Sequence, residues 1–334
     1  MTSKAKSRSK CVFSFLVVGI ALLVLFFLSI NLGSIRLTVP QLLRGLFIEY
    51  DKDVASVYDL RFPRILISMM GGAALAVAGA LFQSVLKNPL ADPGLLGVSS
   101  GAGFAAVLAS MIFPQLYFMT PLFSFLGGLL VFFMVYALAW KGSLSPLRII
   151  LLGIAMQSLF TGLSEALESM MGGNQSGVAS IVEGNITMKT WKDVHLMAVV
   201  FVIGLVLAFI SARWCNLCGL EDRTVRGLGI DIDKVRFAIS VTAVFLVGGC
   251  TAIIGPVSFI GLLVPHIGRI CVGSDHRRLL PFSALAGAVL FLLADTLGRT
   301  LIRPNEMNAS VILAVVGGIA FILLLRKSGG VYGK

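Results

Sequence analysis

Three acidic residues lie inside long apolar segments, where a carboxylate is costly: Asp295, Glu165 and Glu168. An Asp at the middle of a membrane helix costs about 2.5–3.5 kcal/mol on insertion scales. Glu165 and Glu168 are one helical turn apart and can border a watery cavity from one helix face. For Asp295 we expect hydrogen bonds within a helix bundle. Three such carboxylates are too few to predict a proton relay.

Other reactive side chains form no recognisable catalytic pattern. His195, His266 and His276 are far apart in sequence and form no HExxH pair, and no Ser/His/Asp set has a known spacing. Cys215 and Cys218 form one CxxC, which without a second pair or a nearby His is more simply incidental than a metal or redox site. No Gly-x-x-x-x-Gly-Lys-Ser/Thr motif occurs, so the chain has no P-loop for ATP hydrolysis. We expect no enzyme, no catalytic residue, and no metal or cofactor bound by this chain.

The composition indicates which kind of protein carries these residues. The 334 residues are 57% hydrophobic and only 13% charged, whereas soluble domains carry about 25% charged residues. Such a chain cannot cover a globular surface with polar groups, and it is too apolar for disorder. The sequence therefore predicts an integral membrane protein and excludes soluble enzymes and nucleic-acid-binding domains.

Ten apolar segments follow one another, and most are long enough to cross about 30 Å of hydrocarbon. They cover residues 11–32, 64–84, 94–113, 117–140, 147–170, 193–212, 235–254, 256–271, 280–298 and 308–326. The eighth is short and begins at Gly255-Pro256, which predicts that it packs inside the protein rather than against lipid. A cleavable signal peptide is the alternative for the first segment, but the apolar run is long and has no clear cleavage site. We expect one all-α domain over residues 1–334 with about ten transmembrane helices.

The net charge of +11 is distributed unevenly along the chain. With ten crossings and an inner N-terminus, the inner loops hold 18 of the 27 Lys and Arg residues and the outer loops hold 9. Because positively charged loops stay in the cytosol, this bias predicts that both termini are cytosolic in a bacterial cell membrane. The charge is therefore interpreted as a sign of orientation and not of nucleic-acid binding.

Small residues recur at the spacing of close helix contacts. Gly72, Ala76 and Ala80 are four residues apart, and Gly127-Gly128 and Gly317-Gly318 form pairs. Such residues let helix backbones approach each other in membranes. We expect packing seams at these positions.

The most polar stretch after the N-terminus is the predicted cytosolic loop 213–236. It is interpreted as two short helices with a glycine hinge at Gly227-Leu228-Gly229. Apolar residues alternate with its charges, which a merely solvated loop would not need. We expect it to dock another protein.

Several motifs carry a family resemblance that covers nearly the whole chain. They are Arg61-Phe62-Pro63-Arg64, Gly79-Ala80-Leu81-Phe82-Gln83, the run from Asn88 to Gly101, the run from Gly255 to His266, and Ala294-Asp295-Thr296-Leu297-Gly298-Arg299. With these motifs the chain resembles the permease subunits of type II ABC importers for iron chelates, haem and cobalamin. The resemblance implies ten helices per subunit, a cytosolic ATPase dimer that binds ATP and Mg, an extracytoplasmic substrate-binding lipoprotein, and a second permease subunit that is identical or paralogous.

The resemblance also implies roles for individual residues of this chain. Contact with the ATPase is implied for Leu220, Glu221, Asp222, Arg223, Arg226, Gly227, Leu228 and Gly229. It implies that the outer arginines Arg61, Arg64 and Arg299 bind acidic residues on the binding protein. It also implies a substrate path on the two-fold axis, lined mainly by the fifth and tenth helices. The candidate residues that line this path are Gln157, Thr161, Glu165, Glu168 and Asn308.

The last helix departs from the usual family pattern, because Met307-Asn308-Ala309-Ser310 replaces the common Ile-Pro-Val-Gly. Together with residues 186–193, this departure resembles the haem permeases of Gram-positive surface haem-uptake systems. Met170, Met171 and Met188 offer soft apolar contacts for a porphyrin, although they are equally ordinary membrane methionines.

We therefore expect a permease that moves an iron compound, haem first, from a binding protein to the cytosol by alternating access. A ferric siderophore or cobalamin permease of the same family remains the nearest alternative. An ion-coupled secondary transporter would instead need paired charges at the midplane and no docking loop. A membrane scaffold or enzyme without transport activity is a third possibility.

Overall fold

The chain folds into a bundle of long helices. The computed structural model describes residues 2–32, 38, 40–41, 44–45, 48, 51–141, 143–170, 186–187, 189–302 and 305–328. The long helices in these ranges are α1 (Thr2–Asn31), α4 (Phe62–Val85), α5 (Val98–Ile112), α6 (Thr120–Ala139), α7 (Pro146–Met170), α9 (Trp191–Cys218), α11 (Ile232–Ile254), α12 (Ile260–Val272), α13 (His276–Thr300) and α14 (Ala309–Ser328). The short elements are α3 (Lys52–Leu60), η1 (Pro93–Leu96), η2 (Pro114–Met119), α10 (Asp222–Gly227) and the two-residue strands β1 (Trp140–Lys141) and β2 (Ser143–Leu144), which pair antiparallel.

Each of the ten predicted segments corresponds to one long helix, which confirms the all-α polytopic prediction. Within the part of the chain that the structure describes, seven helical spans are long and apolar enough to cross a membrane, and α5, α12 and the apolar part of α14 are shorter. The segment predicted at 256–271 begins later, at Ile260, because residues 255–259 are not helical.

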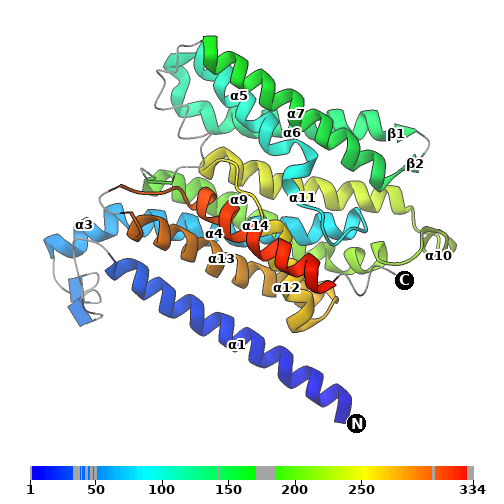
Figure 1. Ribbon diagram of the computed structural model, residues 1–334, viewed down its shortest axis with the longest axis horizontal. Coiled ribbons are helices and arrows are strands. Elements are labelled where there is room, and N and C mark those ends of the chain that lie inside the picture. The colour runs from blue at the N-terminus through cyan, green and yellow to red at the C-terminus, as the bar shows by residue number, and fades with distance from the viewer. Residues whose placement is uncertain are drawn as a thin grey trace.

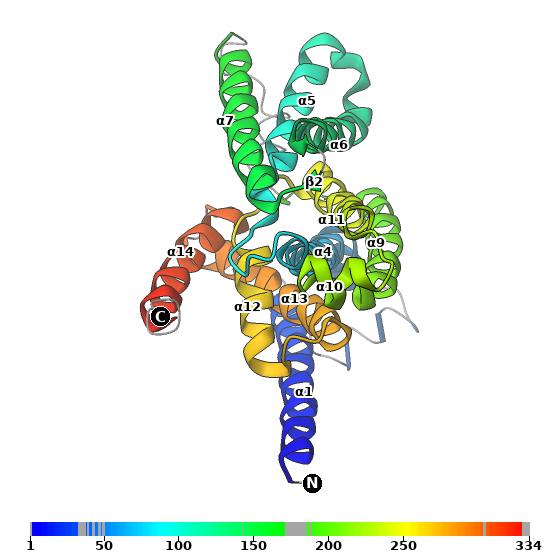
Figure 2. The same cartoon turned by 90° about the vertical axis from the view of Figure 1, so that its right-hand side faces the viewer.

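Helix α4 forms the centre of the bundle. Twenty of its 24 residues are buried, and it contacts α9, α11, α12 and α13. Viewed along the bundle, α4 lies inside the ring formed by these helices (Figure 2). The helices α5, α6 and α7 form a group on one side, while α14 and α1 project on others.

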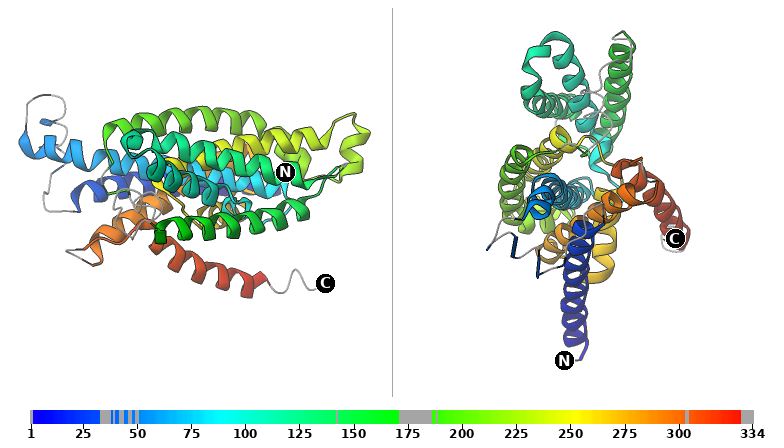
Figure 3. Two further views of the ribbon diagram at one scale, coloured as in Figure 1. Left: turned by 90° about the horizontal axis from the view of Figure 1, so that it is seen from above. Right: turned by 90° about the vertical axis from the view of Figure 1, so that its left-hand side faces the viewer.

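The long helices run roughly along one axis, so the bundle has two distinct ends. The start of α1, the end of α14 and α10 lie at one end, and α3 lies at the other (Figures 1 and 3). We call the first the α10 end and the second the α3 end.

Small residues bring α4 close to its neighbours, as the sequence predicts. A Cβ on Gly72 would lie 2.2 Å from the carbonyl oxygen of Gly287 in α13, and the Ala76 side chain packs at the same crossing. A Cβ on Gly127 would lie 2.2 Å from the Ala105 Cβ, so α6 and α5 also meet closely. The seam continues at Gly79, where a Cβ would lie 2.0 Å from the carbonyl oxygen of Gly261 in α12.

The predicted loop 213–236 is shorter than expected. Helix α9 continues to Cys218 and α11 already begins at Ile232, so only residues 219–231 connect them. The prediction of two short helices is wrong, because these residues form the single helix α10 followed by a turn. Gly229 takes a positive φ of 77° in this turn, so a glycine is needed there.

We predict that Gly79→Ala destabilises the protein by about 1–3 kcal/mol, because the added methyl group has no room beside the α12 backbone. Gly19→Ala is the matched control, since nothing lies within 4 Å of its Cβ position. Size-exclusion chromatography after heating in detergent measures the midpoint temperature of unfolding. This temperature should fall for Gly79→Ala and stay unchanged for Gly19→Ala. Equal midpoints for both variants would contradict the proposed close contact.

Candidate functional site

A polar cavity of about 350 Å³ lies beside α7. It is lined by Gly94, Ser99, Ser100, Gly103, Gln157, Thr161, Ser164, Glu165, Glu168, Pro256, Val257 and Ser258. These residues come from α7, from η1 and the start of α5, and from the segment between α11 and α12. Four of the five residues that the sequence indicates for a substrate path therefore border one cavity.

The α7 residues of the cavity share one helix face. Gln157, Thr161, Ser164, Glu165 and Glu168 recur at intervals of three and four residues, which is the spacing of a single face. The remainder of α7 is mostly apolar and carries few buried side chains. Through this face, α7 can offer hydroxyl, amide and carboxylate groups to a polar or charged cargo. The other faces of α7 suit lipid or another apolar surface.

Two breaks in the helical backbone supply the opposite wall. Gly97, with φ 71°, separates η1 from α5, and the segment 255–259 separates α11 from α12 with positive φ at Gly255 (75°) and Phe259 (70°). The hydroxyls of Ser99 and Thr251 lie 3.2 Å apart and connect the two regions. Irregular backbone at membrane depth is tolerated where it is buried in protein or lines a watery cavity.

Sequence reasoning missed the serines and glycines of this wall. Pro93-Gly94 and Gly255-Pro256 signal turns, and this signal could have indicated that Ser99, Ser100 and Ser258 lie beside breaks in the helical backbone. We had interpreted the second break only as a sign of internal packing.

Asn308 does not belong to the residues that line the cavity. It lies half-buried before α14, where its carbonyl oxygen accepts hydrogen bonds from the backbone amides of Val311 and Ile312. Among the described residues, no group of three His, Cys, Asp or Glu side chains could hold a metal ion.

A buried ion cluster lies toward the α3 end. Asp295 is fully buried on α13 and accepts a hydrogen bond from Arg64 Nε of α4 at 2.9 Å. Arg299 Nε lies 3.4 Å from the other carboxylate oxygen. Arg64 also pairs with Glu306 at 2.6 Å, which connects α4 to the segment before α14. The expected hydrogen bonding of Asp295 within the bundle is confirmed.

This cluster corrects the prediction for two of the outer arginines. Arg64 is 6% exposed and Arg299 is 8% exposed, so their side chains do not present charge on an outer surface. The reason is that the buried carboxylate of Asp295 needs cationic partners to offset its desolvation. Arg61 is half-buried and donates to the Ile30 carbonyl oxygen at 2.6 Å. Its docking role remains a prediction.

At the α10 end, α10 is fastened to the bundle by its inner face. Val225 is completely buried, and the carboxylate of Asp222 accepts hydrogen bonds from both terminal nitrogens of Arg236, at 2.8 and 2.9 Å, and from Lys87 at 2.8 Å. Although partial burial opposes it, hydrogen bonds from Arg236 and Lys87 hold the pKa of Asp222 below its usual value. Arg226 forms an ion pair with Asp233 at 3.1 Å.

The opposite face of this region is open. Leu220 is 43% exposed and Leu228 is 63% exposed, and exposed Glu221, Arg223, Gly227 and Gly229 lie between or beside them. We call these six residues the α10 surface. Large apolar side chains next to charges on an exposed turn are typical of a docking surface rather than of a solvated loop.

Comparison with known proteins identifies the fold. The FecCD transport family model matches residues 21–327. The chain is 40% identical over 323 residues to a Staphylococcus aureus (strain MSSA476) protein named "Probable heme-iron transport system permease protein IsdF", and the match covers 97% of this chain and 98% of the relative.

Solved structures give the same result. A metal-chelate type ABC transporter in an inward-facing conformation matches with a TM-score of 0.82 and 26% identity, over 93% of this chain and 98% of that one. The structure of PsaBC from Streptococcus pneumoniae in complex with Fab matches with a TM-score of 0.59 and 15% identity, over 86% of this chain and 95% of that one, and supports the fold alone.

The chain belongs to the FecCD transport family. It is a membrane-spanning permease subunit of an ABC transporter, and a separate ATPase subunit hydrolyses ATP. The prediction of an ATP-driven permease over an ion-coupled transporter or an enzyme is thereby confirmed.

We predict that Asp295→Ala costs about 3–5 kcal/mol of stability, because it leaves Arg64 and Arg299 buried without their shared carboxylate. Asp59→Ala is the matched control, since Asp59 is an exposed residue of α3. Thermal unfolding of the purified variants measures the difference. An Asp295→Ala protein as stable as Asp59→Ala would show that the cluster contributes little.

Proposed function

We propose that this chain is the permease of a haem importer. The observation that carries the proposal is the 40% identity, over 97% of the chain, to a relative named as a haem-iron permease. The polar cavity beside α7 supports the same function, because it offers a few polar groups without a tight metal-binding cluster among the described residues. A path that held its cargo tightly would oppose release.

The face of α7 that lines the cavity forms the wall of the substrate path in this proposal. Gln157 and Thr161 provide hydrogen-bonding groups, and Glu165 and Glu168 provide negative charge. A second permease subunit, identical or paralogous, completes the path. Exposed apolar side chains on α14, at Val311, Val315, Ile319 and Ile322, support the presence of such an apolar partner surface.

The methionines suggested for haem contact are only partly described. Met170 is 75% exposed at the end of α7, two residues beyond Glu168. Met171 and Met188 lie outside the described residues. Contact of Met170 with a porphyrin remains part of the proposal.

We assign the α10 end to the cytosol, with both termini on that side of the bacterial cell membrane. The excess of Lys and Arg in the loops of this end supports the assignment. The α10 surface then contacts the ATPase dimer, whose subunits bind ATP and Mg. A substrate-binding lipoprotein delivers the cargo at the α3 end, near Arg61.

The test of the proposed substrate is uptake of radioactive iron by cells that lack this chain. Iron is offered as haem in one culture and as a ferric siderophore in another, and cobalamin uptake is measured in parallel. We expect loss of haem uptake alone, restored by the chain supplied on a plasmid. Loss of siderophore or cobalamin uptake instead would retain an importer but refute haem.

We predict that Arg223→Glu combined with Leu228→Glu abolishes transport while the permease still inserts normally. Both side chains are exposed on the α10 surface and form none of the contacts that hold α10 in place, so the change acts on the partner. Arg278→Glu is the control and should retain uptake, because Arg278 is exposed in the first turn of α13, which Asn216 near the end of α9 contacts.

The ATPase is pulled down with a tagged permease from membranes to measure assembly directly. Capture should fall to background for the double variant and stay normal for Arg278→Glu. Unchanged capture and uptake in the double variant would remove the α10 surface from the ATPase interface.

A further inference from the structure

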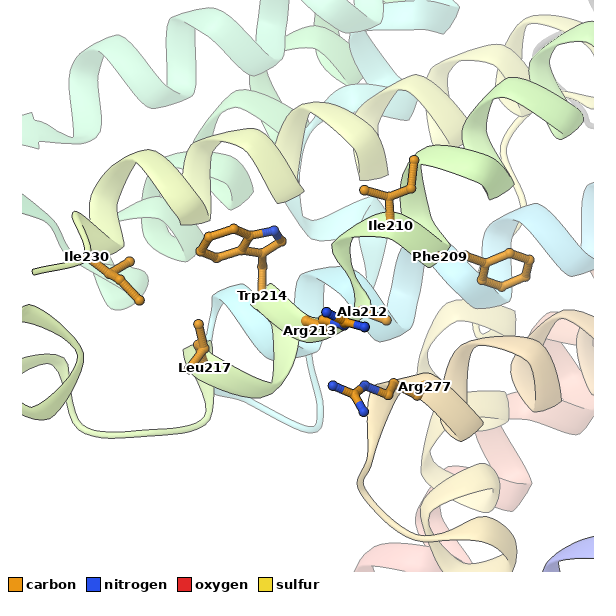
Figure 4. Close-up of a pocket in the computed structure, with 8 residues that line it drawn as sticks. All are labelled: Phe209, Ile210, Ala212, Arg213, Trp214, Leu217, Ile230 and Arg277. Carbon is orange, nitrogen blue, oxygen red and sulfur yellow. The ribbon is translucent and has the colours of Figure 1, made fainter. Parts of the chain in front are cut away.

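A second pocket, of about 770 Å³, opens on the exposed face of α9 near the α10 end. It is lined by Phe209, Ile210, Ala212, Arg213, Trp214, Leu217, Ile230 and Arg277 (Figure 4). It lies apart from the cavity beside α7, because α9 and α7 occupy different sides of α4 (Figure 2). The proposed transport path does not use any of these residues.

A stripe of exposed apolar side chains on α9 leads directly into this pocket. Its members are separated by three or four residues and are each 46% to 65% exposed: Leu196, Val199, Ile203, Val206 and Ile210. The next position on the same face is Arg213 and the one after it is Leu217. Because this spacing defines one helix face, the apolar face of α9 ends at the positively charged side chain of Arg213.

The second cation comes from another helix. Arg277 lies in the first turn of α13, and Figure 4 shows its guanidinium group and that of Arg213 facing each other across the gap between α9 and α13. Within the described ranges, neither guanidinium group forms an ion pair at 4.0 Å or less with an acidic side chain. Asp275, the N-cap of α13, accepts hydrogen bonds from Asn216 at 2.7 Å and from the backbone amide of Arg277 at 3.1 Å, and its charge also interacts with Arg277 over a longer distance.

The remaining lining residues suit the boundary between hydrocarbon and water. Trp214 is 43% exposed beside Arg213, and its amphipathic ring is of the type enriched at membrane interfaces. Phe209 and Ile210 lie on one side of Arg213, while Leu217 and Ile230, which precede and follow α10 in the chain, lie on the other (Figure 4). A ligand that fits this arrangement has an anionic head and a long apolar tail.

We propose that this pocket binds an anionic phospholipid. The lipid phosphate accepts hydrogen bonds from Arg213 and Arg277, its headgroup lies beside Trp214, and an acyl chain lies along the stripe on α9. The pocket borders α10 through Ile230 and Leu217, so the bound lipid supports the position of the segment that carries the α10 surface. Basic pockets between transmembrane helices at the cytosolic face are recognised sites for anionic headgroups.

The test uses the full-length chain, purified in a mild detergent and titrated with dioleoyl phosphatidylglycerol or dioleoyl phosphatidylcholine. Native mass spectrometry measures the dissociation constant of each lipid. The test variant is Arg213→Gln with Arg277→Gln, and the control is Arg278→Gln with Arg326→Gln, which removes the same charge from exposed positions outside the pocket. A third titration adds glycerol phosphate, which has the anionic group without the acyl chains.

We expect the unmodified chain to bind phosphatidylglycerol at least about tenfold more tightly than phosphatidylcholine, since each Arg near the membrane surface contributes about fivefold. The test variant should lose this preference, the control should keep it, and glycerol phosphate should not compete. Equal binding of both lipids by the unmodified chain would refute the proposal even if the test variant did not fold. Retained preference in the test variant, or competition by glycerol phosphate, would also refute it.

Discussion

The structure depends on one constraint: backbone groups that leave helical hydrogen bonding at membrane depth must be satisfied inside the protein. Within the described residues, one such break separates α4 from α5 and another separates α11 from α12, and Pro93 in the first lies against Gly261 just after the second. Gln83 Nε2 donates to the carbonyl oxygens of Ala91 in one break, at 3.3 Å, and Gly261 beside the other, at 3.1 Å. The side chain of Asp92 in the first break accepts a hydrogen bond from the backbone amide of Gly94 at 2.8 Å. A single polar junction therefore accommodates both breaks.

The position of the proposed path follows from this junction. Because the breaks expose backbone and small polar side chains on one side, α7 can contribute a polar face opposite them and form a cavity within an otherwise apolar bundle. Helix α4 keeps the breaks aligned, since glycines bring it into backbone contact with α12 and α13. The ion cluster around Asp295 fixes α4 to α13 and, through Glu306, to the segment before α14. Helix α4 therefore connects the elements around the cavity, and it also reaches the α10 end of the bundle.

The sequence predicts the elements of this protein more reliably than their side-chain contacts. Hydropathy was sufficient for all ten helices, because each crossing needs its own apolar run. Two carboxylates in an apolar segment indicated Glu165 and Glu168 from the sequence alone, whereas Gln157 and Thr161 were implied only by the family resemblance. The family resemblance implies an outer docking role for Arg64 and Arg299, but their motifs do not show that both side chains are buried. Only the folded bundle places Arg64 beside Asp295, 231 positions away in the chain. The extent of the 213–236 loop was overestimated because charged ends of α9 and α11 continue as helix beyond the hydrocarbon.

The most direct test of the central claim is cysteine labelling of α7 in the assembled transporter. Single cysteines at Gln157, Thr161, Glu165 and Glu168, and at Leu159 and Leu163 between them, are introduced into a chain whose five native cysteines are replaced. A membrane-impermeant maleimide is applied with and without ATP trapping. If the polar face of α7 lines the path, the first four positions are labelled and their labelling changes with ATP, while Leu159 and Leu163 stay unreactive. Uniform labelling along α7, or none at the four polar positions in either state, would contradict a path along this face.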